Sequence, residues 1–121
     1  MSINELVIST LSSVVPDISV SEHTGDEKGK RKPETFLVII PIYDNLYLHA
    51  DDTPTMQSEE IELALYTKGN YLALRNRITK LLLKAGVTIL ERRYVEYESD
   101  TGYHHYTFDL ALAQSLEMEE F

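Results

Sequence analysis

The sequence contains no cysteine, no tryptophan and no long hydrophobic run, and it has only four prolines and five glycines. The absence of cysteine excludes a disulfide scaffold, a thiolate zinc site, an iron–sulfur cluster and a cysteine nucleophile. Because no stretch of about 18 apolar residues occurs, we expect no membrane span. The N-terminus lacks a basic region ahead of an apolar one, so we expect no signal peptide.

Basic residues are also scarce. The chain has 11 Lys and Arg against 20 Asp and Glu, which gives a formal charge of −9. This balance argues against sequence-independent nucleic-acid binding, which needs a dense basic surface. The 121 residues suit a single domain, 1–121, because domains cluster at roughly 100–150 residues. A chain of this size buries about two-thirds of its unfolded surface, so it can form a core without cross-links.

Two helices are predicted. Ser2 and Glu5 form a capping box at the start of the first helix, and Pro16 ends it. Asn70 is a suitable N-cap for the second helix, and Gly86 stands where a left-handed residue follows a helix. Apolar residues recur at helical spacing in both segments. They are Ile3, Leu6, Val7, Leu11 and Val14 in the first helix, and Tyr71, Leu74, Ile78, Leu81, Leu82 and Ala85 in the second.

The remaining apolar segments favour strands. Pro41 predicts an edge or a bulge because proline has no N–H to donate, and Asp44-Asn45 predicts a turn into a short hairpin partner. The mixture of helices and strands without regular alternation indicates an α+β fold, with an antiparallel or mixed sheet of about four to five strands packed against helices. The predicted extended segments are 18–21, 35–43, 46–49, 60–68, 87–98 and 103–113, with Ile89, Tyr94, Val95, Tyr97, Tyr106, Phe108, Leu110 and Leu112 as packing candidates.

The segment 22–34 contains no large apolar residue, so we expect a mobile charged loop there. Its basic cluster, Lys28 to Lys32, is either a solvated loop or a contact with an acidic protein surface or DNA. The segment 51–55 around Pro54 is also expected to be a loop.

No catalytic constellation is evident. The sequence has no phosphate-binding glycine motif and no nucleophile elbow. His49, Asp51 and Asp52 offer metal-ligand chemistry, but ordinary turn chemistry explains the aspartates beside a proline better. His104 and His105 are adjacent on a strand and should point to opposite faces. We therefore predict a protein that is not an enzyme, with no catalytic residue, no metal site and no cofactor.

Protein contacts are the favoured use of the remaining features. The eight tyrosines suit a core and an interface better than a stacking platform for nucleic acid, because the net charge has the wrong sign. Arg75, Arg77, Lys80 and Lys84 on the second helix form either a solvated face or a surface that meets an acidic neighbour. The carboxylates Glu59, Glu60 and Glu62 alternate with apolar residues and are expected at surface positions.

Three segments occur in an order that resembles one family. They read Tyr-x-His-Ala-Asp-Asp (Tyr47 to Asp52), Glu-Ile-x-Leu-x-Leu-Tyr-Thr-Lys-Gly-Asn-Tyr (Glu60 to Tyr71) and Tyr-Glu-x-Asp-Thr-Gly-Tyr-His-His-Tyr (Tyr97 to Tyr106). Across residues 35–114, this order resembles small tail proteins of long-tailed phages, as found in prophages of Gram-positive bacteria. The chain is similar to their tail-completion group, also called tail-terminator or head–tail joining proteins. The basic segment 25–33 has no match in that group.

The resemblance implies a structural virion protein that acts as a ring, usually a hexamer, at the head-proximal end of the tail tube. Its partners would be further copies of itself, the tail tube protein and the head connector protein, with genomic DNA passing through unbound and no membrane contact. Its place would be the virion tail, and the host cytoplasm during assembly. Candidate assembly residues are Asp51, Asp52, Arg77, Lys80 and Lys84. The alternative is a non-enzymatic protein-binding adaptor of another kind, such as a minor tail or neck component.

Overall fold

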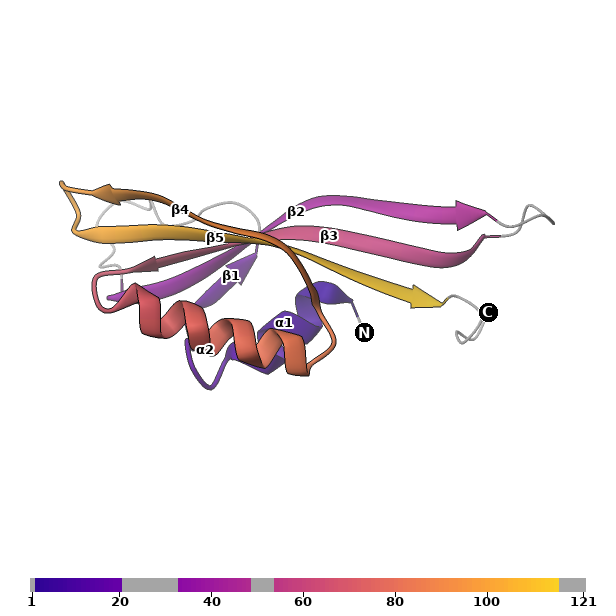
Figure 1. Ribbon diagram of the computed structural model, residues 1–121, viewed down its shortest axis with the longest axis horizontal. Helices are drawn as coiled ribbons and strands as arrows, with labels where there is room; N and C mark the ends of the chain where they lie inside the picture. Colours follow the sequence, from indigo (N-terminus) through magenta and orange to yellow (C-terminus); the bar gives the residue numbers. More distant parts are fainter. Residues whose placement is uncertain (1, 21–32, 49–53, 116–121) are drawn as a thin grey trace.

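Two helices lie on one face of a five-stranded mixed sheet with strand order β1-β2-β3-β5-β4 (Figure 1). The computed structural model describes residues 2–20, 33–48 and 54–115. This arrangement confirms the predicted α+β class. The elements are α1 (Ile3–Leu11), β1 (Ile18–Val20), β2 (Thr35–Leu48), β3 (Pro54–Thr67), α2 (Tyr71–Lys84), β4 (Thr88–Glu98) and β5 (Tyr103–Ser115).

The predicted capping box starts α1. The Ser2 hydroxyl accepts from the Glu5 N–H, and the Glu5 carboxylate accepts from the Ser2 N–H at 2.9 Å. A second carboxylate reaches the start of α1 from the sheet, because Glu59 of β3 accepts from the Ile3 N–H at 2.9 Å. The helix ends at Leu11, earlier than the predicted stop at Pro16. The chain then continues in turns whose N–H groups, including that of Val15, still bond to the Leu11 carbonyl.

β1 pairs in parallel with the start of β2, and β2 pairs antiparallel with β3. The Leu37 N–H donates to the Asp17 carbonyl, so N–H groups of alternate residues from Leu37 point away from β3. Pro41 is one of these residues, and its missing N–H therefore removes no bond between β2 and β3. The register shifts between Pro41 and Tyr43, so the predicted bulge is confirmed, whereas β2 itself is an inner strand between β1 and β3.

The predicted turn at Asp44-Asn45 is wrong. Asp44 pairs with Glu59, Asn45 pairs with Ser58, and β2 runs on to Leu48. Residues 46–48 are therefore part of the same strand, and they do not return as a hairpin partner. Long pairing with β3 overrides the local turn preference of Asp and Asn, and β3 correspondingly starts at Pro54, inside the segment predicted as a loop.

α2 and the hairpin after it follow the prediction closely. The Asn70 side chain accepts from the Ala73 N–H at 3.1 Å, and Gly86 has φ +94° beyond the last turn. β4 and β5 pair antiparallel, as predicted. Register shifts at Leu90 and Val95 break the alternation of β4, and Tyr94, Val95 and Tyr97 are exposed in place of their predicted packing.

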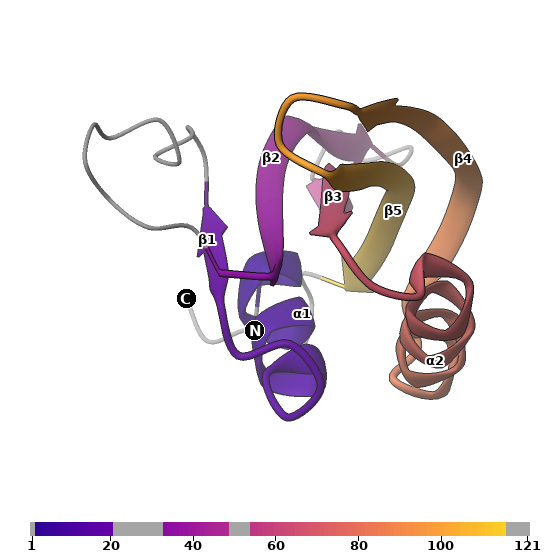
Figure 2. The same ribbon diagram turned by 90° about the vertical axis from the view of Figure 1, so that its left-hand side faces the viewer.

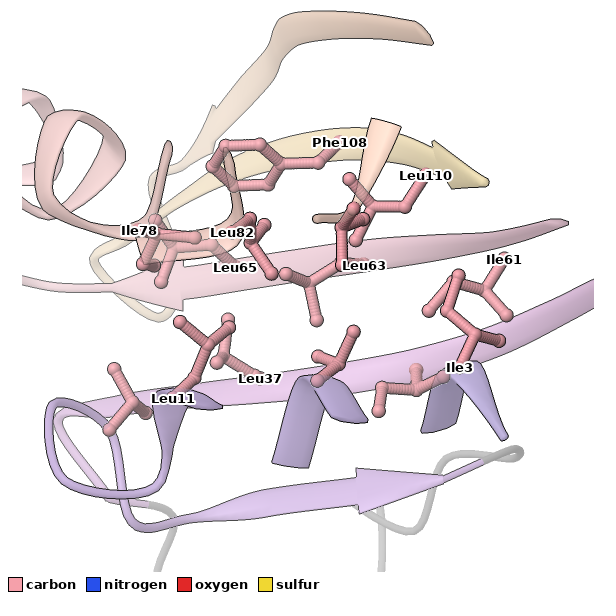
Figure 3. Close-up of a cluster of buried hydrophobic side chains, with 14 of the residues drawn as sticks. Ile3, Leu11, Leu37, Ile61, Leu63, Leu65, Ile78, Leu82, Phe108 and Leu110 are labelled. Atoms are coloured by element: carbon pink, nitrogen blue, oxygen red, sulfur yellow. The ribbon is translucent and has the colours of Figure 1, made fainter. Parts of the chain in front are cut away.

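The core lies between the helices and the sheet (Figure 3). Ile78 and Leu82 of α2 are buried as predicted, whereas Leu74 is only partly buried. Leu112 of the predicted β5 face is likewise partly buried. Fully enclosed side chains come from both helices and from β2, β3 and β5, and they include Val7, Leu11, Leu37, Ile39, Leu63, Leu65, Phe108 and Leu110.

The predicted mobile loop 22–34 falls mostly outside the described residues, which resume at Pro33. At its end the Pro33 carbonyl accepts from the Tyr103 hydroxyl, and the Glu34 carbonyl accepts from the Lys68 N–H. Pro33 and Glu34 are thus held by hydrogen bonds to Tyr103 of β5 and to Lys68, the residue that follows β3.

Candidate assembly surface

The sheet face opposite the helices is the first candidate surface, because neither α1 nor α2, the helices of the described ranges, covers it (Figure 2). Residues that pair directly across adjacent strands share a face. Phe36, Tyr66 and His105 form one such row over β2, β3 and β5. Their rings stack, with centroids 4.8 Å apart for Phe36 and Tyr66 and 4.3 Å apart for Tyr66 and His105.

Burial and nearby carboxylates set the ionisation of this row. Burial raises the pKa of Tyr66, and the carboxylates of Glu98, Glu62 and Glu96 raise it further. Burial lowers the pKa of His105, although the same three carboxylates oppose that effect. At neutral pH the row is therefore uncharged, and it stands among negative charges.

Two polar atoms on this face are buried without a hydrogen-bond partner in the described structure. They are Nε2 of His105 and Oγ1 of Thr107. Thr107 pairs with Ala64 of β3 and Arg93 of β4, in the row next to the stacked rings. An unpaired buried hydroxyl costs free energy, so this face has unused hydrogen-bonding capacity.

The outer side of α2 is the second candidate surface. Arg77, Lys80 and Lys84 are exposed there, as predicted, and we refer to them as the cationic stripe. Arg75 does not belong to it, because the residue is only partly exposed and its guanidinium donates to the Asn76 side chain at 3.0–3.1 Å. Leu72 and Leu83 of α2 are also exposed.

A third cluster gathers aromatic rings beside the first turn of α2. His104 lies 5.0 Å from both Tyr71 and Tyr97 between ring centroids, and its Nδ1 is 3.1 Å from the Tyr94 hydroxyl. His105 instead stacks on the opposite face, so the two histidines point apart as predicted. The exposure of Tyr94 and Tyr97 fits the predicted use of tyrosine at interfaces.

Asp51 and Asp52, the other candidate assembly residues, lie outside the described residues, as does His49. The sheet separates the neighbouring carboxylates, since Glu59 faces α1 while Glu62 lies on the opposite face. Within the described ranges, no three His, Asp or Glu side chains are placed to hold a metal ion. The helices of those ranges include none long and apolar enough to cross a membrane.

No protein-family model matches the sequence, and a search of curated proteins finds no match.

The sequence reasoning missed the grouping of carboxylates on the exposed face. Asp109 of β5 pairs with Glu62 of β3 on one side and with Glu91 of β4 on the other, and we call these three residues the carboxylate row. The alternation of Glu60 and Glu62 with apolar residues was the only local signal for it. The other pairings of the row depend on strand register, which places Glu62 opposite Asp109, 47 positions later in the sequence.

Proposed function

We propose that the protein is a structural virion component that terminates a phage tail tube and helps to join the tail to the head. It acts as a ring of copies, and the resemblance implies six copies. The resemblance of the segments Tyr47 to Asp52, Glu60 to Tyr71 and Tyr97 to Tyr106 motivates this proposal.

The observation that best supports it is the reach of β2 and β3. Each strand has 14 residues, which at about 3.4 Å per residue gives a length of about 48 Å. Their distal parts extend past both helices (Figure 1). Such an arm can contact a neighbouring subunit or the end of a tube, and Asp51 and Asp52 stand in the connection between its two strands.

The negative net charge of the chain also supports a role in tail termination. Six copies would carry a formal charge of −54, six times the −9 of one chain. An acidic channel repels DNA phosphates, so a genome could slide through it without binding. A ring also requires contacts between different surfaces of successive copies, and these contacts must close after a full turn.

The test is tail length in the phage that encodes the chain. Replacing Asp51→Lys with Asp52→Lys should leave folding intact, because surface changes away from packed features alter stability by only about 0.5 kcal/mol. It should produce tails of irregular length or tails without heads in electron micrographs. Asp17→Lys with Asp100→Lys is the control, since both residues are exposed outside the helices and strands and the charge change is the same.

Uniform tails joined to heads in the Asp51, Asp52 variant would show that this connection is not an assembly surface. Normal tails after deletion of the whole gene would refute tail completion itself.

The alternative, a protein-binding adaptor such as a minor tail or neck component, is favoured by the exposed Leu72, Tyr94 and Tyr97 around the first turn of α2. Mass measurement of the protein bound to tails separates the two roles. A ring of several copies per tail supports termination, and a single bound copy supports the adaptor.

A further inference from the structure

The carboxylate row concentrates like charge. Glu62 and Asp109 lie directly opposite each other, as do Asp109 and Glu91, and like charges in such positions destabilise a sheet. Glu91 has one ion pair, with Arg93 at 3.3 Å, but both side chains are more than half exposed. Water screens such a pair strongly. The row therefore keeps an excess of negative charge that a cationic partner would offset.

The chain itself contains a surface of the opposite sign. α2 carries four basic residues and no acidic residue, although the whole chain has a formal charge of −9. Three of the four basic residues form the exposed cationic stripe. Because α2 packs on one face of the sheet and the carboxylate row lies on the other, the two surfaces cannot meet within one copy (Figure 2).

The two surfaces match in length. The stripe runs from Arg77 to Lys84, seven steps along the helix, which spans about 10.5 Å at 1.5 Å per residue. The carboxylate row crosses two inter-strand spacings of about 4.8 Å, or about 9.6 Å in total. A helix laid across the strands would place three cations over three carboxylates.

Apolar groups beside the charges also suit a protein partner. Ile40 continues the carboxylate row on β2 and is 40% exposed, and Leu83 stands between Lys80 and Lys84 and is 57% exposed. The face thus offers a charged and an apolar contact together.

We propose that the cationic stripe of one copy docks on the carboxylate row of the next copy. The inference rests on the proposed function, in which copies must contact one another, and it names the two surfaces that meet. The contact is head-to-tail, since it uses a different surface on each partner, and it forms a ring when the rotations of successive copies close.

Sedimentation velocity of the full chain tests this contact, over a concentration series at low and high salt. Wild-type protein should associate at low salt and less so at high salt, because salt screens exposed charges. A helix variant, R77E/K80E/K84E, and a sheet variant, E62K/E91K/D109K, should each associate about tenfold more weakly, as expected when three modest surface ion pairs are lost. Mixing the two variants in equal amounts should restore association, because each then meets an opposite charge.

Three results would overturn the proposal. They are a wild-type protein that stays monomeric at every concentration, a variant that associates like wild type, and a mixture no stronger than either variant alone. K28E/K30E/K32E is the control for net charge, and an equal loss of association in it would also overturn the proposal. If circular dichroism shows that the sheet variant is unfolded, E62Q/E91Q/D109N replaces it, and its association should still weaken.

Two further measurements distinguish this contact from nucleic-acid binding and from tail termination. Fluorescence anisotropy with a labelled DNA duplex tests the stripe as a nucleic-acid surface. If wild-type protein binds the duplex, and the helix variant loses this binding but still self-associates like wild type, the proposal is overturned. Capping of purified tail tubes is scored separately. Capping by the helix variant as well as by wild type would refute this contact and leave tail termination standing, whereas charge-dependent association without any capping would refute tail termination alone.

Discussion

Ile78→Ala is the sharpest test of the core between α2 and the sheet. Ile78 is 0% exposed and lies beside Leu82 within the buried cluster (Figure 3). The substitution removes three carbon atoms, which at about 0.8 kcal/mol per buried CH₂ costs about 2.4 kcal/mol of transfer free energy. A residual cavity adds to this cost, and isoleucine-to-alanine changes in cores reach about 2–5 kcal/mol in total. Because Ile78 is fully buried within the core cluster, we expect a loss of about 3–4 kcal/mol.

Equilibrium unfolding in urea, followed by far-UV circular dichroism, measures this loss. The midpoint should fall while the slope with urea stays constant, because the surface exposed on unfolding hardly changes. Leu83→Ala is the matched control on the same helix. Leu83 is 57% exposed and alanine favours helices, so its loss should stay below about 1 kcal/mol.

A loss below about 1 kcal/mol for Ile78→Ala, or one no larger than that of Leu83→Ala, would refute the packing described for α2. If Ile78→Ala does not fold, Ile78→Val should still lose about 0.5–1.5 kcal/mol.

Three further perturbations use the same unfolding assay. The lowered pKa of His105 means that the folded chain binds fewer protons there than the unfolded chain, so the free energy of unfolding falls as pH drops below about 6.5. His105→Phe keeps an aromatic ring stacked on Tyr66 and should reduce this loss of stability at low pH. An unchanged pH profile in His105→Phe would show that His105 does not cause the loss. Asn70→Ala removes the cap on the Ala73 N–H and should cost about 1 kcal/mol, with Asn70→Ser as the conservative control. A Cβ added at Gly86 would meet no atom within 4 Å, but the residue has φ +94°. Gly86→Ala should therefore cost about 1 kcal/mol through backbone strain alone, and a neutral effect would contradict that conformation.

Elements with strong local signals were predictable from the sequence. α2 has a cap at Asn70 and a left-handed residue at Gly86, and both positions are as predicted. β5 alternates cleanly, so Tyr106, Phe108 and Leu110 could be assigned to the core. In these segments local preference and tertiary packing agree, which makes the short-range pattern sufficient.

The errors have two physical causes. Asp44-Asn45 is a good turn sequence, but cross-strand pairing with Ser58 and Glu59 holds it extended. Such pairing depends on a segment more than ten residues away, which no local pattern reports. In β4, each bulge at Leu90 and Val95 inserts one residue and shifts the alternation, so an assignment of inward residues by simple alternation fails there.

Of the candidate surfaces, one could be predicted from local sequence and another could not. The cationic stripe follows from helical spacing within α2 and was predictable, except that Arg75 turns aside to Asn76. The carboxylate row required the register of β3, β5 and β4 to be known.

The position of β5 has a consequence for synthesis of the chain. β5 is the last strand of the described residues, yet it lies inside the sheet between β3 and β4 and supplies Phe108 and Leu110 to the core. Every strand pairing of β4 within the described residues is with β5. A nascent chain that ends before Tyr103 therefore leaves β4 without a strand neighbour and leaves the core without Phe108 and Leu110. Truncated translation products should be substrates for chaperones and proteases, and only chains completed through β5 can reach the folded state.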